Sequence, residues 1–170
     1  RRHTRCSRDW SSDVALPILT LDTAQIGSLT TEQVAALTTA QVVALTTDQV
    51  YALKTNQLAS MTTAQVAAME TDDLLMLTTA QIRGFTTAQV AALSTDQLLS
   101  MGTDQIAALT TAQVAALTTA QVVALTTDQV SNMKTAQVAT LTTQQVAAME
   151  TDDLQSLSTA QTIEIGRAHV

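Results

Sequence analysis

The chain has 170 residues, of which only 14% are charged and 2% aromatic, so any core must be built from leucine, valine, methionine and alanine. No apolar run approaches the roughly 20 residues of a membrane-spanning helix, which excludes membrane insertion, and a single cysteine excludes an internal disulfide framework. A net charge of −7 argues against a surface that binds nucleic-acid phosphates.

The first 18 residues differ in composition from the tract that follows. They contain Cys6, Trp10 and Pro17, residue types that are absent between residues 19 and 163. Asp9 to Val14 and Ala15 to Ile18 resemble a translated sequencing adapter, read in two frames. The resemblance implies a processing artefact, so we expect residues 1–18 to form no domain, to pack poorly and to carry no function.

Residues 19–163 consist of one tandem octad, Leu-Thr-Thr-Ala-Gln-Val-Ala-Ala, which runs eighteen times from Leu21. Counted from the leucine, position one is Leu, Met or Phe, and position three is always Thr. Position five is Gln except at Asp73 and Asp153, position six is apolar except at Thr162, and positions seven and eight are mostly Ala. A fixed short period is typical of a solenoid. Residues 29–74 recur as 109–154 with nine differences, which indicates a duplication of ten octads.

The octad period selects between strand and helix. Positions one and six have opposite parity, so a strand cannot place both on one face. A continuous helix fails as well, because eight residues advance it by about 800° and the apolar stripe drifts by about 80° per repeat. The chain must therefore break and restart in every octad. The sequence predicts an all-α solenoid of very short helices, one per eight-residue repeat, which depend on stacking for stability.

Two registers are open for the start of each helix. Thr110 and Gln113 have the spacing of a capping box, with Leu109 and Val114 as the hydrophobic staple. However, position two is Lys or Glu in four octads whereas position three never varies, so we favour position three as the N-cap. The structural repeat residues singled out at positions three and five are Thr31, Thr39, Thr47, Thr111, Thr119, Thr127, Gln33, Gln41, Gln113 and Gln121.

Aspartate at position four recurs with a mean spacing of a little over three octads. This spacing is a candidate for the number of octads in one superhelical turn, although the duplication alone could account for half of it. The residues are Asp48, Asp72, Asp96, Asp104, Asp128 and Asp152.

The tract holds little that could perform chemistry. It contains no Cys or His, and a Thr nucleophile needs an adjacent base. The acidic pairs Asp72-Asp73 and Asp152-Asp153 suit the positive end of a helix dipole better than acid–base work or calcium binding. We therefore expect no enzyme activity, no metal site and no cofactor.

The C-terminal segment, Glu164 to Val170, also resembles a translated sequencing adapter. The resemblance implies that residues 164–170 form no domain, and we expect the natural tract to be a fragment of a longer protein.

Two resemblances concern the tract itself. Leu29 to Val34 resembles the opening helix of transcription-activator-like effector repeats, which bind DNA, but the second helix and base-reading loop of that family are absent. Twelve acidic against three basic residues between positions 19 and 163 would repel a duplex. The whole tract is similar to short Thr/Ala/Gln/Val tandem tracts of large bacterial secreted or surface proteins, often adhesin-like, which implies a spacer or adhesive role.

Three functions follow as hypotheses. The first is a non-catalytic spacer or scaffold in a larger bacterial protein, secreted or at the cell surface, which stacks on further copies of its own repeat. The second is a protein- or peptide-binding module, which clustering of the variable side chains would favour. The third is ice or surface binding through exposed threonines. The variable residues of the possible partner face are Tyr51, Lys54, Leu75, Arg83, Leu99 and Lys134.

Overall fold

The computed structural model describes residues 18–168, which form one short 3-10 turn and eighteen α-helices, without a strand among them. Every helix begins at the invariant threonine of its octad. The elements are η1 Ile18–Thr20, α1 Thr23–Ser28, α2 Thr31–Ala35, α3 Thr39–Val43, α4 Thr47–Tyr51, α5 Thr55–Ser60, α6 Thr63–Ala67, α7 Thr71–Met76, α8 Thr79–Gly84, α9 Thr87–Ala92, α10 Thr95–Ser100, α11 Thr103–Ala108, α12 Thr111–Ala115, α13 Thr119–Val123, α14 Thr127–Ser131, α15 Thr135–Val138, α16 Thr143–Ala148, α17 Thr151–Ser156 and α18 Thr159–Ala168.

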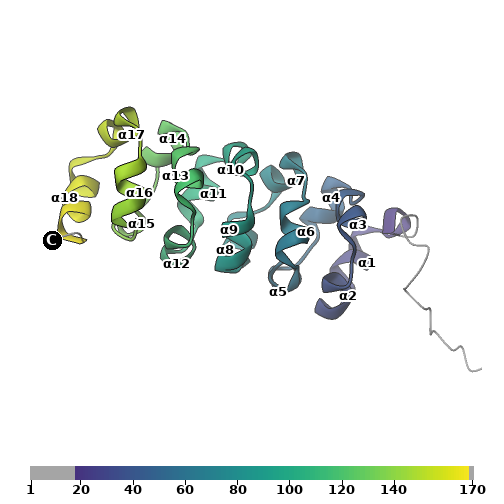
Figure 1. Ribbon diagram of the computed structural model, residues 1–170. Helices are drawn as coiled ribbons and strands as arrows, with labels where there is room; N and C mark the ends of the chain where they lie inside the picture. The colour runs from purple at the N-terminus through teal and green to yellow at the C-terminus, as the bar shows by residue number, and fades with distance from the viewer. Residues whose placement is uncertain (1–17, 169–170) are drawn as a thin grey trace, which may run out of the picture.

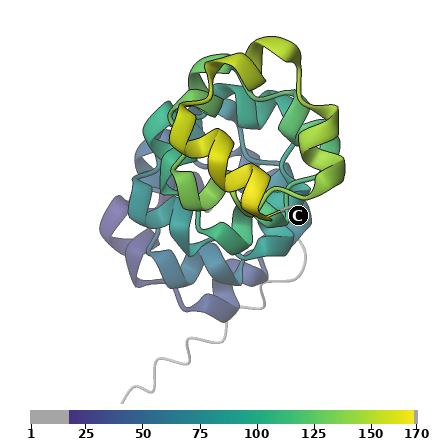
Figure 2. The ribbon, with the colours of Figure 1, turned by 90° about the vertical axis from the view of Figure 1, so that its left-hand side faces the viewer.

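Each helix packs against the helix three octads further along the chain, as α4 does on α7 and α7 on α10. Three octads therefore make one coil, and the coils follow one another from the N-terminal to the C-terminal end of the stack (Figure 1). Seen from its C-terminal end, the stack has its helices arranged around a common axis (Figure 2). The predicted all-α solenoid is confirmed, and the spacing of Asp48, Asp72 and Asp96 corresponds to one coil.

Positions one and six of the octads fill the interior, as the sequence predicts. Val114 at position six is fully buried and Leu117 at position one is nearly so. Phe85 and Met101 occupy position one in the same way and belong to the same continuous cluster. Helices of four to six residues are unstable alone, so burial of these two side chains in every octad, each contributing about 1.5–3 kcal/mol, holds the helices in place.

Each helix ends without a left-handed residue. The N–H of Leu117 donates to the carbonyl of Val114 at 3.1 Å, which tightens the last turn. The residue at position one then adopts extended backbone angles, as Leu93 does with φ −61° and ψ 141°, and leads the chain into the next octad. Because no described residue has a positive φ, the octad needs neither Gly nor Asn at its corner.

The ends of the described chain pack against the stack. Ile18 is buried, and α18 continues to Ala168 with Ile165 packed on the core. The expectation of poor packing is therefore wrong for Ile18 and Ile165. The same expectation for residues 1–17 and 169–170 lies outside the described residues. None of the described helices is long and apolar enough to cross a membrane.

Candidate functional site

The glutamine at position five joins successive coils. In α12, the Oε1 atom of Gln113 accepts a hydrogen bond from the N–H of Thr110 at 2.7 Å. Its Nε2 atom donates to the carbonyls of Phe85 at 2.7 Å and Ile82 at 3.1 Å, which lie one coil earlier. A helix end leaves backbone groups unpaired, and one amide supplies both an acceptor and two donors. Gln113 therefore satisfies the start of its own helix and the end of a helix in the preceding coil.

The same bond to the carbonyl 28 residues earlier recurs along the stack, and we call this series the glutamine ladder. The donors are buried, and buried amides need partners. The sequence identified the capping-box role of glutamine but not the bond between coils, because the number of octads per coil was open. The ladder residues are Gln49, Gln57, Gln65, Gln81, Gln89, Gln97, Gln105, Gln113, Gln121, Gln129, Gln137, Gln145 and Gln161.

The preference for position three as the N-cap is wrong. The N-cap is position two: the Thr110 side chain accepts a hydrogen bond from the Gln113 N–H at 3.2 Å, and the two residues form a capping box. Lys54 occupies the same place in α5 without a side-chain cap bond, yet its N–H still donates to Gln57 Oε1 at 2.6 Å. Substitution at position two is tolerated because the glutamine half of the box remains.

Position three is the first helical residue and faces the next coil. The Thr127 hydroxyl donates to Asp153 Oδ1 at 2.9 Å, 26 residues later. A Cβ atom built on Gly84, at position eight of α8, would lie 2.1 Å from the Cγ2 atom of Thr55. Position three therefore lies in the contact between coils. The other predicted repeat threonines, Thr31, Thr39, Thr47, Thr111 and Thr119, begin α2, α3, α4, α12 and α13 in the same way.

The cap register gives a direct mutational prediction. Thr110→Val removes the oxygen that caps α12, so the free energy of unfolding should fall by about 1 kcal/mol. Thr111→Val removes no cap and should cost clearly less. Urea denaturation of the two variants measures the difference. An equal or larger loss at Thr111 would restore position three as the cap.

Asp73 interrupts the ladder. It takes the place of glutamine in α7, is only 2% exposed, and its Oδ2 atom has no hydrogen-bond partner. Burial raises the pKa of the Asp73 carboxyl, the hydrogen bond from Thr47 lowers it, and the charges of Glu70 and Asp72 raise it further. A carboxylate cannot donate, so the carbonyls of the preceding coil receive no ladder bond here.

The structure brings together three of the six predicted partner-face residues. Tyr51, Leu75 and Leu99 lie at position seven of α4, α7 and α10, which pack one on the next. All three side chains are exposed. Arg83 lies in α8, while Lys54 and Lys134 precede α5 and α15, so these three belong to other stacks of helices.

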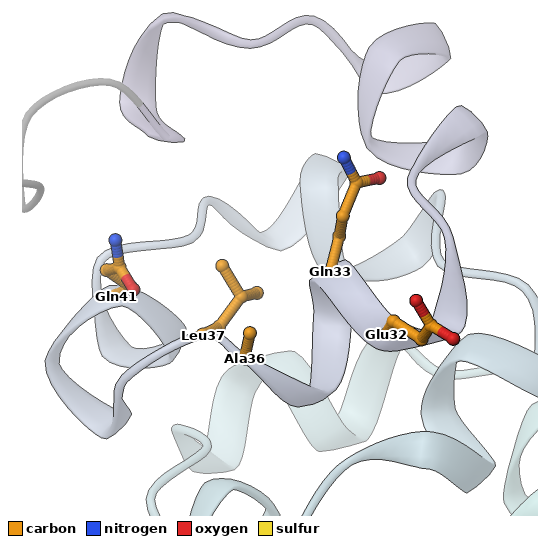
Figure 3. A pocket seen from close by; sticks show the side chains of 5 residues that line it. All are labelled: Glu32, Gln33, Ala36, Leu37 and Gln41. Atoms are coloured by element: carbon orange, nitrogen blue, oxygen red, sulfur yellow. The ribbon is translucent and has the colours of Figure 1, made fainter. Parts of the chain in front are cut away.

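The described surface has two shallow depressions of note. One, of about 270 Å³, lies on α2 and α3; Leu37 and Ala36 lie between Gln41 on one side and Gln33 and Glu32 on the other (Figure 3). The second, of about 410 Å³, lies between α7 and α10 and is lined in part by Glu70, Asp72 and Asp96. Within residues 18–168, no three His, Cys, Asp or Glu side chains are grouped to hold a metal ion.

Comparison with known proteins identifies the repeat. The family model of the ALTTAQ repeat matches residues 18–47, 66–103, 99–135 and 111–143, which together cover more than half of the chain. No curated protein and no solved structure matches the chain. The matched residues contain the octads whose threonines begin the helices and whose glutamines form the ladder. The chain belongs to the ALTTAQ repeat family, a family of structural tandem repeats.

Proposed function

We propose that the tract is a non-catalytic spacer or scaffold within a larger bacterial protein that is secreted or exposed at the cell surface. The observation that carries the proposal is the glutamine ladder, because it joins each coil to the preceding one by the same bonds throughout the stack. Stability in such a solenoid is a sum of repeat and neighbour terms, so copy number sets length.

The internal duplication supports a spacer in particular. It adds ten octads, which is not a whole number of three-octad coils, so the second copy is rotated by one stack of helices relative to the first. Gln57 and Gln137, which are equivalent in the two copies, nevertheless make the same ladder bonds. A contact rule that works octad by octad lets the rod change its length in small steps.

Duplicating residues 85–108, three whole octads, should lengthen the particle by one coil, about 8–10 Å, at an unchanged cross-section. Small-angle X-ray scattering measures both quantities. A matched control carries the same insertion with leucine in place of glutamine at position five of the inserted octads, and it should not extend the rod regularly. A duplicated chain that is no longer than the original would contradict the spacer proposal.

Binding of a protein or peptide is a second candidate function, favoured by the clustering of Tyr51, Leu75 and Leu99 on one stack of helices. Ice or surface binding has less support. The position-two hydroxyls are engaged in caps, as at Thr110, and the position-three threonines are distributed over all three stacks of helices rather than one plane.

A further inference from the structure

An apolar line runs along one stack of helices. Tyr51, Leu75, Leu99 and Val123 occupy position seven of α4, α7, α10 and α13, and each helix packs on the next (Figure 1). Their exposed fractions are 55%, 51%, 45% and 37%. Met76, beside Leu75, is exposed as well. We call these five side chains the apolar line.

The fold does not require this line. The residues equivalent to Tyr51 and Leu75 in the second copy of the duplicated block are Ser131 and Gln155, and α14 and α17 form there with the same capping and stacking. Elsewhere position seven is mostly alanine. Large apolar side chains at exposed positions that tolerate polar ones call for an explanation other than stability.

Carboxylates flank the apolar line. Asp48, Asp72 and Asp96 are exposed and stand three residues before Tyr51, Leu75 and Leu99 in the same helices, so each pair lies on one side of its helix. Glu70, Asp72 and Asp96 line the open depression between α7 and α10. Within residues 18–168 the one ion pair joins Arg167 to Glu164, far along the chain, so no described cation is paired with these carboxylates.

We infer that the apolar line and its carboxylates bind a basic amphipathic α-helix of a partner protein. Stacked helices lie about 8–10 Å apart. Two turns of an α-helix, seven residues, advance about 10.5 Å. A helix running along the stack therefore places side chains seven residues apart against Tyr51, Leu75 and Leu99 in turn. Lysine or arginine beside each apolar residue then faces Asp48, Asp72 and Asp96.

The probe is a synthetic helical peptide of about 20 residues with leucine at every seventh position, lysine on both sides of each leucine and alanine elsewhere. Isothermal titration against the full chain should give a dissociation constant of about 10–100 μM that weakens as salt is raised. A peptide with glutamate in place of lysine should not bind. Equal binding of a peptide whose leucines are shuffled out of the seven-residue spacing would overturn the inference.

The duplicated block supplies variants that keep the fold. The double variant Tyr51→Ser and Leu75→Gln carries the residues of the second copy and should weaken binding at least about tenfold. Val43→Ala removes an exposed apolar side chain from another stack and should leave binding unchanged. Unchanged affinity in the double variant overturns the inference, as does sedimentation showing that the apolar line instead joins two copies of the chain. None of these outcomes affects the length test of the spacer.

Discussion

Replacing Gln113 with leucine should lower the free energy of unfolding by about 3 kcal/mol or more. The substitution nearly preserves volume but leaves the Thr110 N–H and the carbonyls of Ile82 and Phe85 without their amide partner in the interior. Each buried backbone group that loses its partner costs about 1–3 kcal/mol. Because repeat stability is a sum of neighbour terms, the defect should also broaden the urea transition as the two halves of the stack uncouple.

Gln33→Leu is the matched control. Gln33 is exposed at the N-terminal end of the described stack, and its printed bonds are those of the capping box with Thr30. Its loss should therefore cost about 1 kcal/mol, the contribution of a cap alone. If both leucine variants lost the same stability, the bonds between coils would contribute nothing and the importance given to the ladder would be wrong.

The opposite change, Asp73→Gln, should stabilise the protein by about 1–3 kcal/mol at neutral pH. By the register of the ladder, the new amide would donate to the carbonyls of Val42 and Leu45, which lie 31 and 28 residues earlier. It would also remove a buried carboxylate oxygen that has no partner. Urea denaturation at pH 7 measures the gain, and a loss of stability would show that Asp73 is favoured where it stands.

The gain from Asp73→Gln should depend on pH in a defined direction. Burial raises the folded-state pKa of Asp73 above the ordinary value of 3.8, so the folded protein holds this proton more tightly than the unfolded chain. As the pH falls from neutral through the folded pKa, the native side chain becomes protonated and its cost is relieved. The advantage of the glutamine variant should therefore be largest at pH 7 and shrink towards pH 4.

Asp72→Asn separates this effect from a general change in charge. Asp72 adjoins Asp73 in sequence and carries the same charge, but its side chain is exposed. The variant should change the free energy of unfolding by less than about 0.5 kcal/mol at either pH. A pH-dependent gain at Asp72 equal to that at Asp73 would attribute the effect to net charge instead of burial.

The sequence was sufficient for the fold because the octad combines two constraints that only short, restarting helices meet. Positions one and six have to share a face, and the apolar stripe of a continuous helix would drift away from the core. Val114 and Leu117 are buried as this reasoning requires. The number of octads per coil was present in the 24-residue spacing of Asp48, Asp72 and Asp96, but the octad itself does not specify it.

The errors and omissions in the sequence interpretation share a cause. Thr111 never varies between octads because position three lies between coils, whereas invariance was read as capping. The donation by Gln113 to Phe85, and the alignment of Tyr51 with Leu75, likewise depend on which octads face one another. Contacts within an octad could be predicted from its residues, whereas contacts between coils required the number of octads in each coil.

The central claim, that buried glutamine amides join the coils, is tested most directly by hydrogen exchange of the side-chain NH₂ groups, followed by NMR. Single Gln→Leu variants assign the signals. The Gln113 amide should exchange at least about a hundredfold more slowly than the exposed Gln33 amide, because its protons are held by carbonyls inside the stack. Equal exchange rates for Gln113 and Gln33 would contradict the account.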